Sequence, residues 1–111
     1  MRIRRRLGPL AGAAAALLLA CVVTGCGGSS EARPTTGKGI YEANCATCHG
    51  VDGQGGVGPE LAGVVVDKYP NIEDQIAVVT NGKGEMPSWR GDLTPKEIRM
   101  VVEYTRTGLG Q

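Results

Sequence analysis

The stretch Cys45-Ala46-Thr47-Cys48-His49 decides the fold of this 111-residue chain. In a C-x-x-C-H run, the two thiols can each form a thioether to one vinyl group of a single porphyrin. The adjacent imidazole then lies under the iron as its proximal ligand. The run therefore predicts one covalently attached haem c, held by Cys45 and Cys48, with His49 as the first axial ligand of the iron.

Two other interpretations of the paired cysteines stay open at this point. A thioredoxin-like redox pair needs a βαβ context, and the surrounding sequence lacks one. A zinc site needs further ligands. The chain has a single His, and its other cysteines, Cys21 and Cys26, lie in the N-terminal leader.

Residues 1–25 predict an export signal. Met1–Arg6 is cationic, and an apolar stretch rich in Ala and Leu runs from Leu7 to Val23. The segment ends in Val23-Thr24-Gly25-Cys26, which resembles the signal of bacterial lipoproteins. That resemblance implies that Cys26 receives a diacylglyceryl group and becomes the first residue of the mature protein, tethered to the bacterial membrane.

Two alternatives to lipidation of Cys26 concern the same leader. Cys21 could serve as the lipidated residue, although the bulky Leu19 before it fits the pattern poorly. An uncleaved transmembrane anchor is the other alternative, because the seventeen residues from Leu7 to Val23 are at the short limit for spanning a bilayer. All of these alternatives place the following domain on the extracytoplasmic side of the membrane.

The remaining chain divides into a flexible linker over residues 26–35 and a domain over residues 36–111. The linker is polar, contains Pro34 and lacks hydrophobic periodicity. A domain of about 75 residues supports only a marginal core, and this one has no Phe, one Trp and three Tyr. We expect a covalently held porphyrin to supply the missing aromatic bulk.

The charge of the exported part narrows the range of partners. Eight cationic and eleven acidic residues follow Cys26, giving a formal charge of −3. No basic patch indicates binding to nucleic acid, and an acidic surface suits a cationic docking partner. Export also places the thioethers in a compartment where such chemistry is tolerated.

Three helices can be expected from the sequence. The first spans residues 37–46, with Thr35 and Thr36 as candidate N-caps. The second spans residues 72–80, with Asn71 as its N-cap. The stretch Thr94-Pro95-Lys96-Glu97 is a capping box with proline at the first helical position, and it opens a third helix that ends at Gly108.

No strand pair has comparable support. The run Val64-Val65-Val66 is β-branched, but it is too short to build a sheet. The sequence therefore predicts a small all-α domain with Gly-rich loops.

A second axial ligand must come from far enough along the chain to reach the opposite face of the haem. Met86 lies 37 residues after His49 in a loop that Pro87 stiffens. Met1 leaves with the leader, and Met100 falls inside the third predicted helix. Met86 is therefore the expected iron ligand, whereas a loop methionine otherwise fills gaps in packing.

From Gly37 to about Gly108, these residues together resemble the class I cytochrome c family, and the short bacterial mono-haem lipoproteins in particular. The ordered features are Gly37-x-x-x-Tyr41 in the first helix, Val101-x-x-Tyr104 in the last, Gly58-Pro59-Glu60-Leu61, and the loop Gly82–Trp89. The resemblance implies a cytochrome c-like helical fold wrapped around the haem. It also implies that the Pro59 carbonyl accepts the His49 N–H, and that Trp89 either donates to a haem propionate or packs against the ring.

The family resemblance implies an electron carrier and not an enzyme. The expected partners are an oxidase, a quinol:cytochrome c oxidoreductase or a dehydrogenase of the respiratory membrane. A fixed haem-bearing subunit of a larger oxidoreductase is an alternative. A haem peroxidase or gas sensor is another, and it would require Met86 to be labile.

Overall fold

A computed structural model describes residues 32–110, which form five helices and no strand. The fold class is therefore all-α, as the sequence predicts. The leader, Cys26 and the first part of the linker lie outside the described residues. Among the residues described, no helix is both long enough and apolar enough to span a bilayer.

The N-terminal helix pair carries the cysteine motif. Helix α1 spans Gly37–Asn44, and the Thr36 side chain caps it by accepting a hydrogen bond from the Gly39 N–H. A short helix α2 spans Ala46–His49. The predicted single helix over residues 37–46 is thus interrupted at Cys45, whose φ and ψ of −111° and −34° turn the chain between the two helices.

Two helices follow in the middle of the chain. Helix α4 spans Ile72–Asn81, and the Asn71 side chain caps it as expected by accepting from the Glu73 N–H. A one-turn helix, α3, spans Val65–Lys68 and was not predicted. In the sequence, its β-branched residues indicated only a run too short to build a sheet. A single helical turn is too short to show a helical period.

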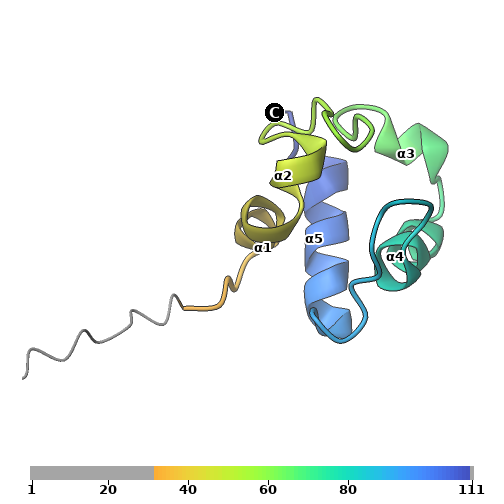
Figure 1. The fold of residues 1–111 in the computed structure, drawn as a ribbon. Coiled ribbons are helices and arrows are strands. Elements are labelled where there is room, and N and C mark those ends of the chain that lie inside the picture. The colour runs from red at the N-terminus through yellow and green to blue at the C-terminus, as the bar shows by residue number, and fades with distance from the viewer. Residues whose placement is uncertain (1–31, 111) are drawn as a thin grey trace, which may run out of the picture. The chain divides into compact units, whose positions relative to one another are not determined.

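Helix α5 spans Pro95–Thr107 and confirms the predicted capping box. The Thr94 side chain accepts from the Glu97 N–H, and the Glu97 carboxylate accepts from the Thr94 N–H. Leu93 and Ile98 are both buried on either side of the cap. Figure 1 shows α5 between α1 and α4, with α2 above α1.

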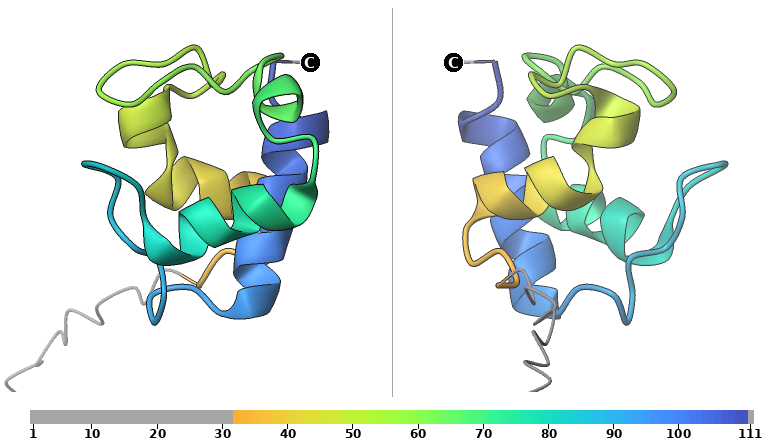
Figure 2. Two further views of the ribbon diagram at one scale, coloured as in Figure 1. Left: turned by 90° about the vertical axis from the view of Figure 1, so that its right-hand side faces the viewer. Right: turned by 60° about the vertical axis from the view of Figure 1, so that its left-hand side comes forward.

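The crossing of α1 and α5 forms the core of the domain, and the views of Figure 2 show the two helices in contact. A Cβ on Gly37 would overlap the Met100 carbonyl oxygen, so only glycine permits this approach. The Tyr41 and Tyr104 rings meet there with centroids 5.6 Å apart and planes inclined by 55°. Tyr41 is fully buried, and its hydroxyl donates to the Gly50 carbonyl at 2.7 Å.

An ion pair binds the end of the linker to the start of α5. Arg33 donates to both Glu97 carboxylate oxygens, at 2.7 and 3.0 Å, and to the Asp92 carbonyl at 2.6 Å. The Arg33 hydrogen bonds, followed by those from the Thr94 N–H and hydroxyl, lower the Glu97 pKa to about 2 from its usual 4.5. A carboxylate with a lowered pKa stabilises the folded state above its ordinary pKa, and the contribution disappears as the pH falls through the lowered value.

We therefore expect Glu97→Gln to lower the free energy of unfolding at neutral pH. The difference from the wild type should shrink between about pH 4.5 and pH 2, because the wild-type carboxylate is protonated across that range. Denaturant titrations at a series of pH values measure the effect. Glu103→Gln, on the exposed face of α5, is the matched control. An equal and pH-independent loss in both variants would contradict the assigned role of Glu97.

Candidate haem site

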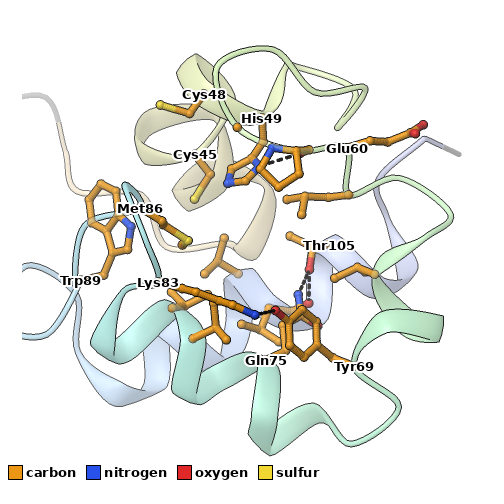
Figure 3. A pocket seen from close by; sticks show the side chains of 18 of the residues that line it. Cys45, Cys48, His49, Glu60, Tyr69, Gln75, Lys83, Met86, Trp89 and Thr105 are labelled. Carbon is orange, nitrogen blue, oxygen red and sulfur yellow. Dashed lines mark hydrogen bonds between the residues drawn. The ribbon is translucent and has the colours of Figure 1, made fainter.

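A cavity of about 380 Å³ is lined by residues of all five helices and of the loops 57–61 and 83–89. This volume falls in the range of about 300–1,000 Å³ found for small-molecule and cofactor sites. Figure 3 shows side chains from the cysteine motif on one wall and those from α4 on the opposite wall. The predicted site residues that line the cavity are Cys45, Cys48, His49, Pro59, Met86 and Trp89.

The His49 imidazole is held by the loop that follows it. Its Nδ1 lies 2.8 Å from the Pro59 carbonyl oxygen, so the ring N–H is on Nδ1 and the lone pair is on Nε2. Within residues 32–110, Nε2 makes no hydrogen bond. A neutral imidazole fixed in this way presents Nε2 as a metal ligand.

The loop that follows His49 lies close to the imidazole because of its glycines. The Gly58 N–H donates to the Cys48 carbonyl at 2.7 Å. A Cβ on Gly58 would lie 2.9 Å from the His49 Cε1 atom, so a larger residue would displace the imidazole. Gly53 is buried with a φ of +71°, and a Cβ there would clash with Leu109. Packing, and not only loop flexibility, therefore requires glycine in this loop.

Met86 reaches the same cavity from a tight turn fixed to α4. Lys83 and Met86 exchange backbone hydrogen bonds of 3.0 and 3.1 Å. The Trp89 N–H then donates to the Val79 carbonyl at 3.1 Å, which fastens the end of the loop to α4. Gly82 begins the turn with a φ of +77°, where a Cβ would overlap the Met86 carbonyl.

Trp89 is partly buried, lines the cavity and packs against the core. Met100, by contrast, packs against the core and does not line the cavity.

The chemistry of the cysteines separates haem attachment from the other interpretations of the motif. Both are free thiols. Burial, and secondarily the nearby Cys48, raises the pKa of Cys45 to about 11. A disulfide-exchange pair requires the opposite shift, because the thiolate is the nucleophile. In the part of the chain that the structure describes, no three His, Cys, Asp or Glu residues cluster as a metal site.

Several polar residues in the cavity were not predicted from the sequence. Tyr69, Gln75, Lys83 and Thr105 all line it. Gln75 offered one signal, because it interrupts the apolar stripe of α4. The others come from separate segments that meet only in the folded chain.

Comparison with known proteins identifies the family. The family model described as "Cytochrome C oxidase, cbb3-type, subunit III" matches residues 32–104. The chain belongs to the class I c-type cytochromes. It is therefore a mono-haem electron carrier and not an enzyme, and its cofactor is haem c with its iron.

This cytochrome is similar to several named relatives. It is 35% identical to chloroplastic cytochrome c6 of Chlamydomonas reinhardtii over 102 residues, covering 86% of this chain and 68% of the relative. It is 38% identical to the cbb3-type cytochrome c oxidase subunit FixP of Azorhizobium caulinodans over 85 residues, covering 70% of this chain but 29% of FixP.

Solved structures show the same fold. Cytochrome c6 of the diatom Phaeodactylum tricornutum superposes with a TM-score of 0.55 at 36% identity, covering 62% of this cytochrome and 85% of that chain. Cytochrome cL of Methylophaga aminisulfidivorans gives a TM-score of 0.59 at 24% identity. The cytochrome cL match covers 66% of this chain and spans about half (52%) of that one, and it bears on the fold alone.

The residues around the cavity fit haem c. Two thiols and an imidazole with a free Nε2 come from one turn of chain, and a thioether comes from a separate loop. These are the groups that attachment and two-sided axial ligation require. The neighbouring lining is mostly aliphatic and aromatic, which suits the faces of a porphyrin.

Proposed function

We propose that this cytochrome carries single electrons between redox proteins of a respiratory membrane, on the extracytoplasmic side, while tethered through a lipid on Cys26. The observation that supports the proposal best is the convergence of Cys45, Cys48, His49 and Met86 on one cavity. The expected partners are an oxidase, a quinol:cytochrome c oxidoreductase or a dehydrogenase.

Each residue has a proposed role toward the haem. Cys45 and Cys48 would form the thioethers, and His49 would bind the iron through Nε2, with its ring oriented by the Pro59 carbonyl. Met86 would supply the second ligand of the iron, and Trp89 would pack against the macrocycle. When bound, haem c supplies an iron that changes between Fe(II) and Fe(III) by one electron.

Ligation by both His49 and Met86 explains why electron transfer and not substrate chemistry is expected. With both side chains bound to the iron, no ligand position would remain for a substrate. The thioether of Met86 favours the reduced iron and raises the reduction potential. Backbone hydrogen bonds between Lys83 and Met86 close the turn that carries this side chain, so we expect little reorganisation of the ligand during the transfer.

The domain boundaries follow from the same proposal: a signal peptide over residues 1–25, a linker over residues 26–35 and a cytochrome domain over residues 36–111. The family match begins at residue 32, close to the proposed end of the linker. Arg33, bound to Glu97, is the last linker residue held by a side-chain ion pair before α1 begins.

A second candidate is a fixed haem-bearing subunit of a larger oxidoreductase. Two observations favour it: the matching family model carries the name of an oxidase subunit, and FixP, an oxidase subunit by name, aligns over 70% of this chain. A mobile carrier and a fixed subunit differ in whether the cytochrome remains with a large enzyme after the membrane is dissolved in mild detergent.

Replacement of Cys26 tests the tether. Cys26→Ser should move the haem-loaded protein from the membrane to the soluble fraction, or leave the leader unprocessed, because serine cannot accept the thioether-linked lipid. Fractionation and mass of the intact chain measure this, with Cys21→Ser as the matched control. Normal processing and membrane retention of Cys26→Ser would contradict lipidation at this residue.

The same variant separates a carrier from a subunit. For a mobile carrier, purified soluble Cys26→Ser protein added in excess should restore electron flux to membranes that lack the cytochrome. For a fixed subunit, the added protein should not restore flux, and the wild type should copurify with a large enzyme.

A further inference from the structure

A buried polar network interrupts the apolar wall of the haem cavity. Gln75 on α4 and Thr105 on α5 are only 5% and 7% exposed, and both line the cavity. The Gln75 Nε2 donates to the Thr105 Oγ1 at 2.7 Å, and that hydroxyl donates to the Val102 carbonyl at 2.7 Å. Figure 3 shows the amide and the hydroxyl joined across the floor of the cavity.

Arg106, which does not itself line the cavity, completes this network. Its Nη1 donates to the Gln75 Oε1 at 3.0 Å and to the Tyr69 carbonyl at 2.8 Å, and its Nη2 donates to the Pro70 carbonyl at 3.2 Å. All three acceptors are neutral. Among residues 32–110, Arg106 forms no ion pair, whereas Arg33 and Arg99 each bind a glutamate.

The direction of every bond in the network is fixed. A guanidinium can only donate, so the Gln75 oxygen must face Arg106 and the nitrogen must face Thr105. The three oxygens around Arg106 come from Gln75 in α4 and from Tyr69 and Pro70, in the connection between α3 and α4. The guanidinium is therefore held in one place beside the cavity, with its charge not neutralised by a carboxylate.

A positive charge in such a place acts on the redox equilibrium. Partly buried charges are screened less by solvent and salt than exposed ones. Oxidation of the iron adds one positive charge to the cavity, and a nearby cation disfavours that charge. We propose that Arg106 stabilises the reduced form of this cytochrome, and that Gln75 is the residue that positions it.

This inference rests on the proposed use of the cavity by the haem, and its test uses the haem-loaded full chain. Arg106→Gln should shift the equilibrium with a reference redox couple toward the oxidised form by about threefold to tenfold, where tenfold corresponds to 59 mV for one electron. Arg106→Lys should retain most of the wild-type potential, because the charge stays. Gln75→Leu should shift the equilibrium in the same direction as Arg106→Gln but less.

Arg99→Gln is the matched control, since it removes the same charge from the exposed face of the same helix. Its shift should be smaller than that of Arg106→Gln and should vanish in about 1 M salt, where screening acts over about 3 Å. The shift in Arg106→Gln should persist under those conditions. Thermal unfolding of every variant is recorded in parallel.

Three results would overturn the inference. One is an equal shift in Arg106→Gln and Arg99→Gln at all salt concentrations, which would report net charge alone. Another is an Arg106→Gln variant with a lower thermal unfolding midpoint but an unchanged reduction potential. Arg106 would then stabilise the fold without acting on the redox equilibrium. The third is an unchanged reduction potential in Gln75→Leu. This variant decides the question if Arg106→Gln fails to load haem. A failure of the proposed function would appear differently, as a wild type without Met86 ligation or without membrane retention.

Discussion

Replacement of both Cys45 and Cys48 by alanine is expected to abolish covalent haem attachment completely. The two sulfurs are the only thiols in the described part of the chain, so no other residue there can form the thioethers. The mass of the denatured chain, from cells that contain haem-ligation machinery, should fall from that of polypeptide plus one haem to that of polypeptide alone.

The same double variant should also lose most of its stability. The described domain buries only eight hydrophobic residues. The cavity lies where side chains would otherwise pack to form a larger core. A group that binds only the folded state stabilises that state. A covalently attached haem does so at any protein concentration, because it does not dissociate. Thermal unfolding followed by circular dichroism should show a transition far below that of the wild type.

Thr47→Ala is the matched control, because Thr47 is exposed between the two cysteines. It should carry one haem and unfold like the wild type. Extraction of the haem from intact wild-type protein by acidified organic solvent would contradict covalent attachment.

Met86→Ala is expected to open the iron to external ligands. The oxidised wild type should show the weak band near the red edge of the visible spectrum that reports iron–methionine bonding, and the variant should lose it. The reduction potential should fall, because the thioether favours the reduced iron. The reduced variant should also gain carbon monoxide binding, and the oxidised variant should gain some peroxidase activity.

Met100→Ala is the control for Met86→Ala. Met100 packs partly buried against the core and does not line the cavity, so the band and the potential should be unchanged. The expected cost is packing stability alone, of about 2 kcal/mol. Loss of the band in Met100→Ala, with the band retained in Met86→Ala, would reassign the ligand. Ready carbon monoxide binding by the wild type would favour the sensor or peroxidase alternative.

Local signals allowed much of the fold to be predicted. The capping box at Thr94–Glu97 and the cap at Asn71 fix helix starts through contacts a few residues apart, and both are present as expected. The break at Cys45 and the single turn Val65–Lys68 were not predicted. Both depend on how the chain folds around the cavity, and no short pattern encodes that.

The same distinction applies to the site. The paired cysteines and His49 are adjacent in sequence, and Met86 is one of only three methionines, so composition limits the choice. The contact from Arg106 to Gln75 joins residues 31 positions apart. Neither residue belongs to a recognisable motif, and their meeting depends on the packing of α4 on α5.

The contact between Arg33 and the start of α5 has a mechanical consequence for a tethered domain. A pull on the linker reaches the ion pair with Glu97 and the bond to the Asp92 carbonyl before it reaches α1. These residues do not line the haem cavity. If Cys26 carries the proposed lipid, a pull from the membrane would be passed to the base of the longest helix, and not directly to the turn that holds Met86.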